Sequence, residues 1–209
     1  MISFAKVENK PACDMKAALL PVLGLCNKAD DPVRPFCAAL CIDSDNKDLL
    51  FWTASPSAVF ASRIEAGELA GDVNMTIRPS CFGLLVEHVR KAKIRLDLEV
   101  VQAAENEVPE LRITTENGTL VIRNEMNPKH PDPRKFLELT EDRVTTPAYV
   151  IPKNSLPFLN AFKGAQCINI LCSTSDTKSA MHVQTTHMES FIRFEALILG
   201  CDPSGFKQN

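Results

Sequence analysis

The stretch IRPSCFGLLVEHVRKAKIRLDL, residues 77–98, combines the end of a strand, a helix and the start of another strand. Pro79 and Ser80 open the predicted helix, because proline is tolerated in a first helical turn. The apolar face of this helix repeats at helical spacing and comprises Phe82, Leu85, Val86 and Val89. The next apolar residues alternate instead, which predicts a half-buried strand at Ile94, Leu96, Leu98 and Val100.

A second stretch, YVIPKNSLPFLNAFKGAQCINIL at residues 149–171, repeats this pattern. Its apolar residues match in order: Ile77 with Ile151, Phe82 with Leu156, Leu85 with Leu159, Ile94 with Ile168 and Leu96 with Ile170. Two amphipathic helices can share part of such a match by chance. The common order of strand, helix and three further strands favours a true structural repeat.

Three such units fit the chain. In the first, the predicted helix spans Asp14–Asn27, with Asp14 as its cap and Pro21 as a kink or break. A polar turn at Asp43–Asp48 separates two of the expected strands. The strands expected in this unit are Phe36–Ile42, Leu49–Thr53 and Ala58–Ile64.

The second and third units follow the same order. In the second, Asn117-Gly118 between alternating strands is a strong hairpin signal. Its strands are expected at Val73–Arg78, Ile94–Val101, Leu111–Thr115 and Thr119–Arg123. In the third, Pro157 fits the first turn of a helix over Pro152–Gly164. Its strands are expected at Tyr149–Ile151, Cys167–Cys172, Met181–Thr185 and Phe191–Leu199.

The units predict an α+β protein with three segments. Residues 1–126 form a domain of two units, and residues 148–209 form the third unit. Between them, residues 127–147 contain several prolines and many charges without periodicity, so they are expected to be a connector.

The composition is that of a globular protein, with 45% hydrophobic and 23% charged residues among 209. The formal net charge of −3 argues against a simple polycationic nucleic-acid binder. It is compatible with basic residues that gather on one surface while acidic residues cover the rest.

The eight cysteines lie mostly in apolar runs such as FCAALCI and CINILC, and we expect them to be buried, reduced thiols. The start, MISFAKVENK, lacks the apolar core of a signal peptide. No window approaches the roughly 18 apolar residues of a membrane span. Together these features predict a cytoplasmic protein.

No catalytic constellation stands out. The sequence has no GxGxxG or Walker-type loop, no GxSxG motif and no compact Cys/His set for zinc, so we expect no enzyme activity, cofactor or metal. Cys81 follows a predicted helix start, a context that can activate a thiol. A small Cys/His enzyme whose residues, such as Cys81 or Cys167, meet a histidine only in the fold therefore stays an alternative.

The order of elements resembles that of DNA sliding clamps, the β-clamp and PCNA-like processivity factors. KAALLPVLGLC, RPFCAALCID and LLFWTAS are similar to the opening of a bacterial β-clamp domain. The family's acid after the strand threonine is missing, because Thr53-Ala54 stands there. MNPKHPDPRKFLEL resembles the segment that joins two clamp domains.

The resemblance implies a DNA-clamp fold of three repeated β-α-β-β-β units, with antiparallel sheets outside and helices on one face. It also implies a non-catalytic ring that encircles duplex DNA independently of sequence, together with a DNA polymerase and a clamp loader as partners. Basic residues of the helix regions would then attract phosphate by counterion release. They are Lys16, Lys28, Arg78, Arg90, Lys91, Lys93, Lys153 and Lys163. Any one of them could instead belong to a solvated helix face.

Clamps also bind short peptides near the interdomain connector. The resemblance places the rim of such a pocket at Phe136, Leu137 and Leu139, which could instead anchor the connector to its own core.

The number of repeated units per chain is the main departure from the family. Clamp rings contain twelve units, whereas this chain offers three, so a homotetramer would complete one. The small size and the unusual unit count suggest a viral or phage protein, and the expected location is the cytoplasm of a bacterium or of a phage-infected cell. The alternative is an adaptor or inhibitor with the clamp fold that binds another protein without encircling DNA.

Overall fold

The computed structural model describes residues 3–26, 39–55, 58–102, 108–123, 130, 132, 155–162, 169–175, 178–186 and 192–199. Its helices are α1 (Ala12–Leu25), the 3-10 turn η2 (Pro79–Cys81), α2 (Phe82–Lys91) and α4 (Leu156–Asn160). The strands of the first half are β1 (Ser3–Val7), β2 (Leu40–Asp45), β3 (Asp48–Ser55), β4 (Ala58–Glu65), β5 (Glu68–Ala70) and β6 (Asn74–Ile77). Those that follow are β7 (Leu96–Gln102), β8 (Glu110–Thr115), β9 (Gly118–Arg123), β10 (Asn169–Ser175), β11 (Lys178–Thr186) and β12 (Ile192–Leu199).

The strands form two antiparallel sheets that exchange strands between the first two units. The five-stranded sheet has the order β5-β1-β7-β8-β9, so β1 of the first unit lies beside the strands of the second. The seven-stranded sheet has the order β10-β11-β12-β4-β3-β2-β6, so β6 of the second unit pairs with β2 of the first. Neither of these units completes a sheet with its own strands.

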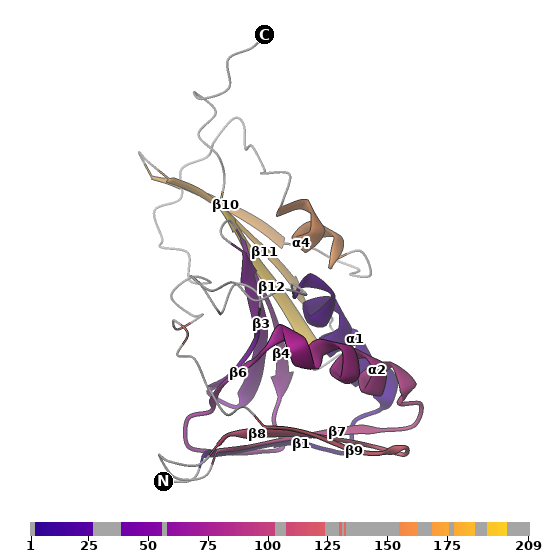
Figure 1. The fold of residues 1–209 in the computed structure, drawn as a ribbon. Coiled ribbons are helices and arrows are strands. Elements are labelled where there is room, and N and C mark those ends of the chain that lie inside the picture. The colour runs from indigo at the N-terminus through magenta and orange to yellow at the C-terminus, as the bar shows by residue number, and fades with distance from the viewer. Residues whose placement is uncertain are drawn as a thin grey trace.

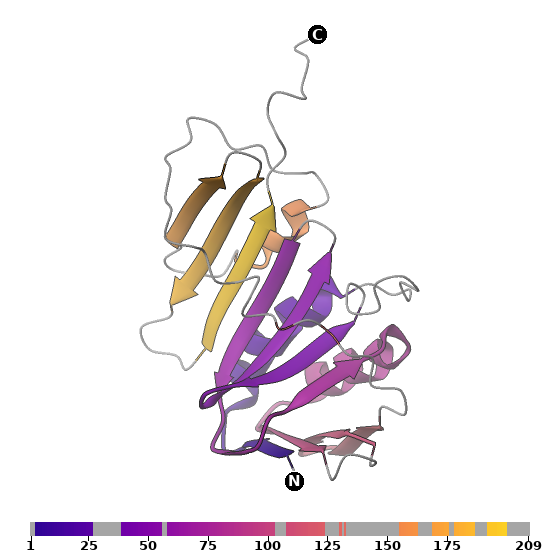
Figure 2. The same ribbon diagram turned by 90° about the vertical axis from the view of Figure 1, so that its left-hand side faces the viewer.

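The helices lie on one face of the seven-stranded sheet. The two sheets diverge at an angle, α1 and α2 fill the space between them, and α4 follows further along the same face (Figures 1 and 2). One core joins both sheets to these helices. Met15 and Val22 of α1 and Leu85 and Val89 of α2 are fully or almost fully buried in it.

The third unit extends the sheet of the first. Strand β12 pairs with β4 from Ile192↔Ile64 to Ile198↔Ala58, and this pairing is called the β4–β12 seam below. On the helix side of the seam, Phe60 stacks on Phe194 at 5.8 Å between ring centroids and meets Phe162 edge-on at 5.4 Å. The first and third units therefore share one apolar core.

A polar network crosses the opposite side of the seam. Arg63 pairs with Asp45 and, at 3.2 Å, with Glu195, while Gln184 lies 3.4 Å from Glu195 and 3.3 Å from His182. Burial opposes the charge of Arg63, but the two carboxylates still raise its pKa. Burial lowers the pKa of His182 despite the nearby Glu195 carboxylate.

Several expected elements are confirmed. Ala58–Ile64 is β4, the strands around Asn117-Gly118 are β8 and β9, and Pro157 lies in the first turn of α4. The loop residues of the β8–β9 hairpin are Glu116 and Asn117, and Gly118 adopts the left-handed φ of 123°. The expected strand at residues 149–151 lies outside the described residues.

Other expectations about the first unit are wrong. Strand β1 precedes α1, although no strand was predicted there. Asp14 does not cap α1, because the helix begins at Ala12 and Pro11 occupies the cap position. Pro21 does not break α1, which continues to Leu25. Packing of α1 against β3, β4, β12 and α2 offsets the roughly 3 kcal/mol that an interior proline costs.

Two strand boundaries also differ. The expected turn at Asp43–Asp48 contains only Asn46 and Lys47, because β2 continues to Asp45 and β3 begins at Asp48. Strand β7 begins at Leu96, so Ile94 lies before it and is 72% exposed instead of half-buried.

Phe60→Ala should lower the free energy of unfolding by about 3–5 kcal/mol, because it leaves a cavity between rings of the first and third units. Denaturant unfolding followed by circular dichroism measures this. Leu84→Ala, at a side chain that is 65% exposed, is the control and should change little. Equal effects of the two substitutions would contradict the shared core.

Stability should also fall as the pH drops below about 6.5, the ordinary pKa of histidine. His182 has a lowered pKa in the folded protein, so the unfolded chain binds more protons in this range. The contribution of His182 is therefore complete above pH 6.5 and is lost at lower pH, by at most about 1.4 kcal/mol per pH unit. His182→Gln should reduce this slope in unfolding curves measured from pH 7 to 5. An unchanged slope would contradict the assignment.

Candidate nucleic-acid interface

The exposed end of α2 carries two of the basic residues that were predicted to bind DNA, and a third follows directly after the helix. Phe82, Leu85 and Val89 face the core, which leaves Arg90 and Lys91 in the last turn exposed to solvent. Their positive charges lie at the helix C-terminus, where the helix dipole favours cations. Lys93 follows two residues later and is also exposed.

These cations differ in how far they are neutralised. Nζ of Lys91 lies 2.6 Å from Oε1 of Glu87, one turn earlier, and this contact lowers the pKa of Glu87. No ion pair to Arg90 or to the Lys93 ammonium is found within the described residues. Arg90 and Lys93 are therefore the two cations of this helix end best placed to meet a phosphate.

Acidic residues limit the positive potential near α2. Glu116 of the β8–β9 loop accepts hydrogen bonds from the backbone N–H groups of Lys93 and Ile94, and backbone bonds of this kind lower its pKa. Arg95 lies 3.6 Å from Asp97. The local surplus of positive charge is small, so any attraction to nucleic acid here must come from several equivalent surfaces.

The other residues predicted to bind DNA are either half-buried or outside the described residues. Lys16 on α1 and Arg78 before η2 are both half-buried. Lys28, Lys153 and Lys163 lie outside the described residues. The structure therefore brings Arg90, Lys91 and Lys93 together at one helix end and leaves the lining role of the full set untested.

A groove of about 790 Å³ separates α1 from α2 beside these cations. Apolar side chains form most of its wall, and Glu87, Arg90 and Lys91 form a charged rim. The apolar lining comprises Leu20, Leu23, Cys26, Pro79, Phe82 and Val86. The Cys26 thiol donates to the carbonyl oxygen of Val22 at 3.3 Å, and burial raises its pKa to about 12, so it is a poor nucleophile.

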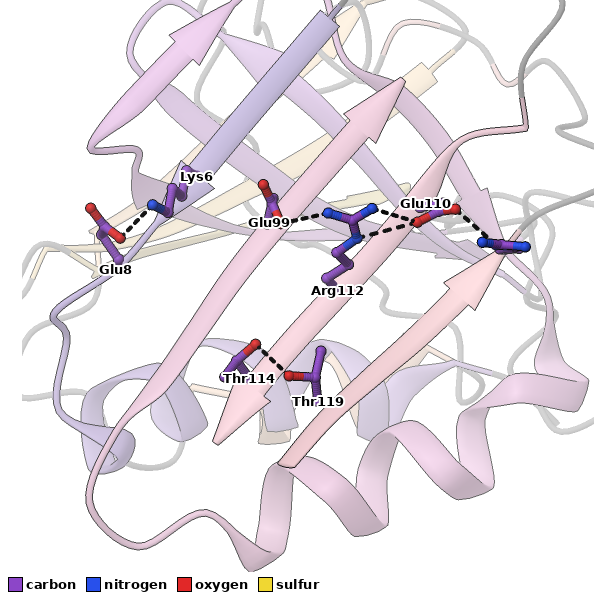
Figure 3. Close-up of polar contacts among 8 residues, drawn as sticks. Lys6, Glu8, Glu99, Glu110, Arg112, Thr114 and Thr119 are labelled. Atoms are coloured by element: carbon purple, nitrogen blue, oxygen red, sulfur yellow. Dashed lines mark hydrogen bonds and ion pairs between the residues drawn. The ribbon is translucent and has the colours of Figure 1, made fainter. Parts of the chain in front are cut away.

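The face of the five-stranded sheet that points away from the helices has a different charge pattern. Its charged side chains pair with one another across the strands (Figure 3). Arg112 lies 3.3 Å from Glu99 and 3.0 Å from Glu110, which also pairs with Arg123 at 2.7 Å. These contacts lower the pKa of Glu110 and raise that of Arg112. Such a self-neutralised surface is a poor phosphate binder.

Within the predicted connector, the structure describes only His130 and Asp132. Phe136, Leu137 and Leu139, the expected pocket rim, lie outside the described residues. His130 is buried against the face of the seven-stranded sheet opposite the helices. Its Nε2 lies 2.8 Å from Asp43 Oδ2, its Nδ1 lies 2.8 Å from Thr76 Oγ1, and its ring meets Trp52 edge-on.

Asp43 is the centre of this cluster. Its carboxylate accepts hydrogen bonds from Trp52 Nε1 at 2.6 Å and from Asn74 Nδ2 at 2.8 Å. Sequence reasoning missed the cluster, because Asp43 and His130 are 87 residues apart and each alone resembles a surface polar residue. This contact fixes one residue of the predicted connector on the sheet of the first unit.

No group of three or more His, Cys, Asp or Glu side chains able to hold a metal occurs in the described part of the chain. None of its helices is long and apolar enough to cross a membrane.

Repeated units of one strand, one helix and three further strands, with antiparallel sheets on one side and helices on the other, define the DNA-clamp fold. Solved structures with this fold include the DNA polymerase III beta subunit of Thermotoga maritima, with a TM-score of 0.58 and 10% identity over 96% of this chain and 65% of that one. The DnaN sliding clamp of Bartonella birtlesii gives 0.59 and 10%, over 97% and 66%. The beta sliding clamp of Caulobacter crescentus gives 0.59 and 12%, over 97% and 67%.

These similarities show that the chain has the fold of DNA sliding clamps. The chain spans about two thirds of the length of the clamps that it matches. No protein-family model and no curated protein sequence matches it.

Asp43→Ala should lower the free energy of unfolding by about 1–3 kcal/mol, because it leaves the buried indole N–H of Trp52 and the ring of His130 without their acceptor. Thermal and denaturant unfolding measure the change. Asp14→Ala, at a half-exposed residue that does not cap its helix, is the matched control and should be nearly neutral. If Asp43→Ala is equally neutral, the cluster does not stabilise the fold.

Proposed function

We propose that the protein is a non-catalytic sliding clamp that encircles duplex DNA and tethers a DNA polymerase. The shared fold with DNA polymerase III beta subunits carries the proposal. Two further observations support it: the helices lie together on one face of the seven-stranded sheet, and the exposed end of α2 carries Arg90, Lys91 and Lys93. The outward face of the five-stranded sheet pairs its own charges instead.

Attraction to DNA would be electrostatic and independent of sequence. Each phosphate that a lysine or arginine neutralises releases counterions, so binding should weaken steeply with salt. The small positive surplus on a single α2 suits a ring, because several copies of a weak patch around a duplex hold it without a tight contact that would stop sliding.

A ring also requires more than one chain. Three units per chain and twelve per ring, as the resemblance implies, correspond to a homotetramer, which we propose as the working assembly. A clamp loader and a polymerase would be its protein partners, in the cytoplasm of a bacterium or a phage-infected cell.

Retention on circular DNA tests this function. The protein is mixed with a plasmid while dilute, concentrated so that rings can close, and passed through a sizing column in moderate salt. A clamp should elute with the circular plasmid and be released when one restriction cut linearises it. Equal retention on both forms, or on neither, would contradict encirclement.

The triple substitution Arg90→Ala, Lys91→Ala and Lys93→Ala should weaken retention and flatten its dependence on salt. Each lost phosphate contact should reduce the slope of log affinity against log salt by about 1. The matched control removes three cations from outside the helix layer, with Lys6→Ala, Lys47→Ala and Arg112→Ala, and should retain the wild-type slope. Identical behaviour of the two triple variants would exclude the end of α2 from the DNA-facing surface.

An adaptor that binds another protein is the second candidate. Leu84 on α2 and Ile94 after it are 65% and 72% exposed, which is unusual for large apolar side chains on a surface meant for phosphate. An adaptor would show no difference between circular and linear DNA. Leu84→Glu would then abolish binding to its partner protein without changing the fold.

A further inference from the structure

The groove between α1 and α2 has no role in the proposed clamp. The most buried of its apolar lining residues include Leu23 and Phe82, which belong to the core that joins both sheets. Leu20 of α1 and Val86 of α2 line it as well and are only half-buried. At about 790 Å³, the groove has the size of pockets that hold small molecules. An apolar group bound there would cover side chains that the fold leaves partly in water.

Two glycines keep this groove open. Gly24 of α1 and Gly83 of α2 both line it, and both are exposed. Neither adopts a left-handed backbone, so alanine would fit their conformation and would favour the helix. A Cβ at either position would meet no neighbouring atom within 4 Å in the part of the chain that the structure describes. Backbone geometry therefore does not explain the glycines, whereas the space that they leave in the groove gives them a role.

The charged rim of the groove favours a negatively charged ligand. Nζ of Lys91 lies 2.6 Å from Oε1 of Glu87, so these two residues neutralise each other. Arg90 belongs to the same rim, and no carboxylate of the described ranges forms an ion pair with it. The rim therefore presents one unneutralised guanidinium, a group whose planar set of donors matches a carboxylate.

We infer that the α1–α2 groove binds a small amphipathic anion, with its apolar chain along Leu20, Leu23 and Val86 and its carboxylate on Arg90. The volume suits one small molecule, and a single cation is left to recognise its charge. Burial of the chain supplies most of the affinity, so each further CH₂ group that the groove accommodates should tighten binding roughly threefold to fourfold. The guanidinium supplies selectivity for an anion over a neutral molecule of the same length.

Isothermal titration calorimetry of the full chain with decanoate, below the concentration at which decanoate aggregates, tests the site. Gly83→Leu should abolish the heat of binding, because the added side chain occupies the groove. The variant should melt no earlier than the wild type, because leucine is a better helix former than glycine. Ser80→Leu adds the same side chain at an exposed residue that does not line the groove, and it should bind decanoate as the wild type does.

A second pair of measurements isolates the charge. Arg90→Gln should weaken decanoate binding by about tenfold or more, because it removes a charge-assisted hydrogen bond. Decanol, which has the same chain and no charge, should bind the wild type and Arg90→Gln equally. Lys93→Gln removes a nearby cation that does not line the groove, and should leave both affinities unchanged.

Occupation of the groove would also engage Arg90, one of the cations of the proposed DNA-facing surface. This consequence rests on the proposed function. Saturating decanoate should lower retention of the wild type on circular plasmid at a given salt concentration, and should not change retention of Gly83→Leu.

The outcomes separate the site from the clamp. No heat from the wild type, or equal binding by the wild type and Gly83→Leu, would overturn the site and leave the clamp function standing. Equal affinities of the wild type for decanoate and decanol would overturn the recognition of an anion. A chain that binds decanoate in the expected pattern but is not retained on circular DNA would support the site and contradict the clamp.

Discussion

The exchange of strands between the first two units is the constraint on which the structure depends. Strand β1 completes the sheet of the second unit and β6 completes the sheet of the first, so neither unit can bury its apolar face alone. Helices α1 and α2 are then enclosed by two sheets of mixed origin and form one core with them. The β4–β12 seam extends this arrangement, because the third unit continues the first unit's sheet and shares its aromatic core.

This architecture separates two kinds of surface. Helices lie on one face of the seven-stranded sheet, with exposed cations at the end of α2, while charged residues on the outward face of the five-stranded sheet pair with one another. Under the proposed clamp function, long-range attraction to a polyanion would come from the helix side. A chain with net charge −3 can still bind duplex DNA in this way, because the distribution of charge and not its sum determines where phosphate is attracted.

Local patterns predicted three helical regions, which contain α1, α2 and the five-residue α4, and most of the strands. The β8–β9 hairpin and α2 were predictable because their signals lie within a few residues: Asn117-Gly118 in one case, apolar spacing in the other. Strand β1 was not predicted, because its five residues are too few to show a clear alternation without a turn signal beside them. Its position depends instead on pairing with β7, more than 90 residues away in the sequence. Ile94 was wrongly assigned to the strand, because the alternation of apolar residues in the sequence begins two residues before β7 does.

The candidate site was predictable in kind but not in detail. The basic residues at the end of α2 could be read from the sequence, whereas the neutralisation of Lys91 by Glu87 and the buried Asp43–His130 cluster depend on side-chain geometry and on contacts distant in sequence. Imaging by electron microscopy is the decisive test of the proposed ring. A clamp should form closed rings of four chains around a hole that admits duplex DNA. Compact single chains at every concentration would contradict the proposed function.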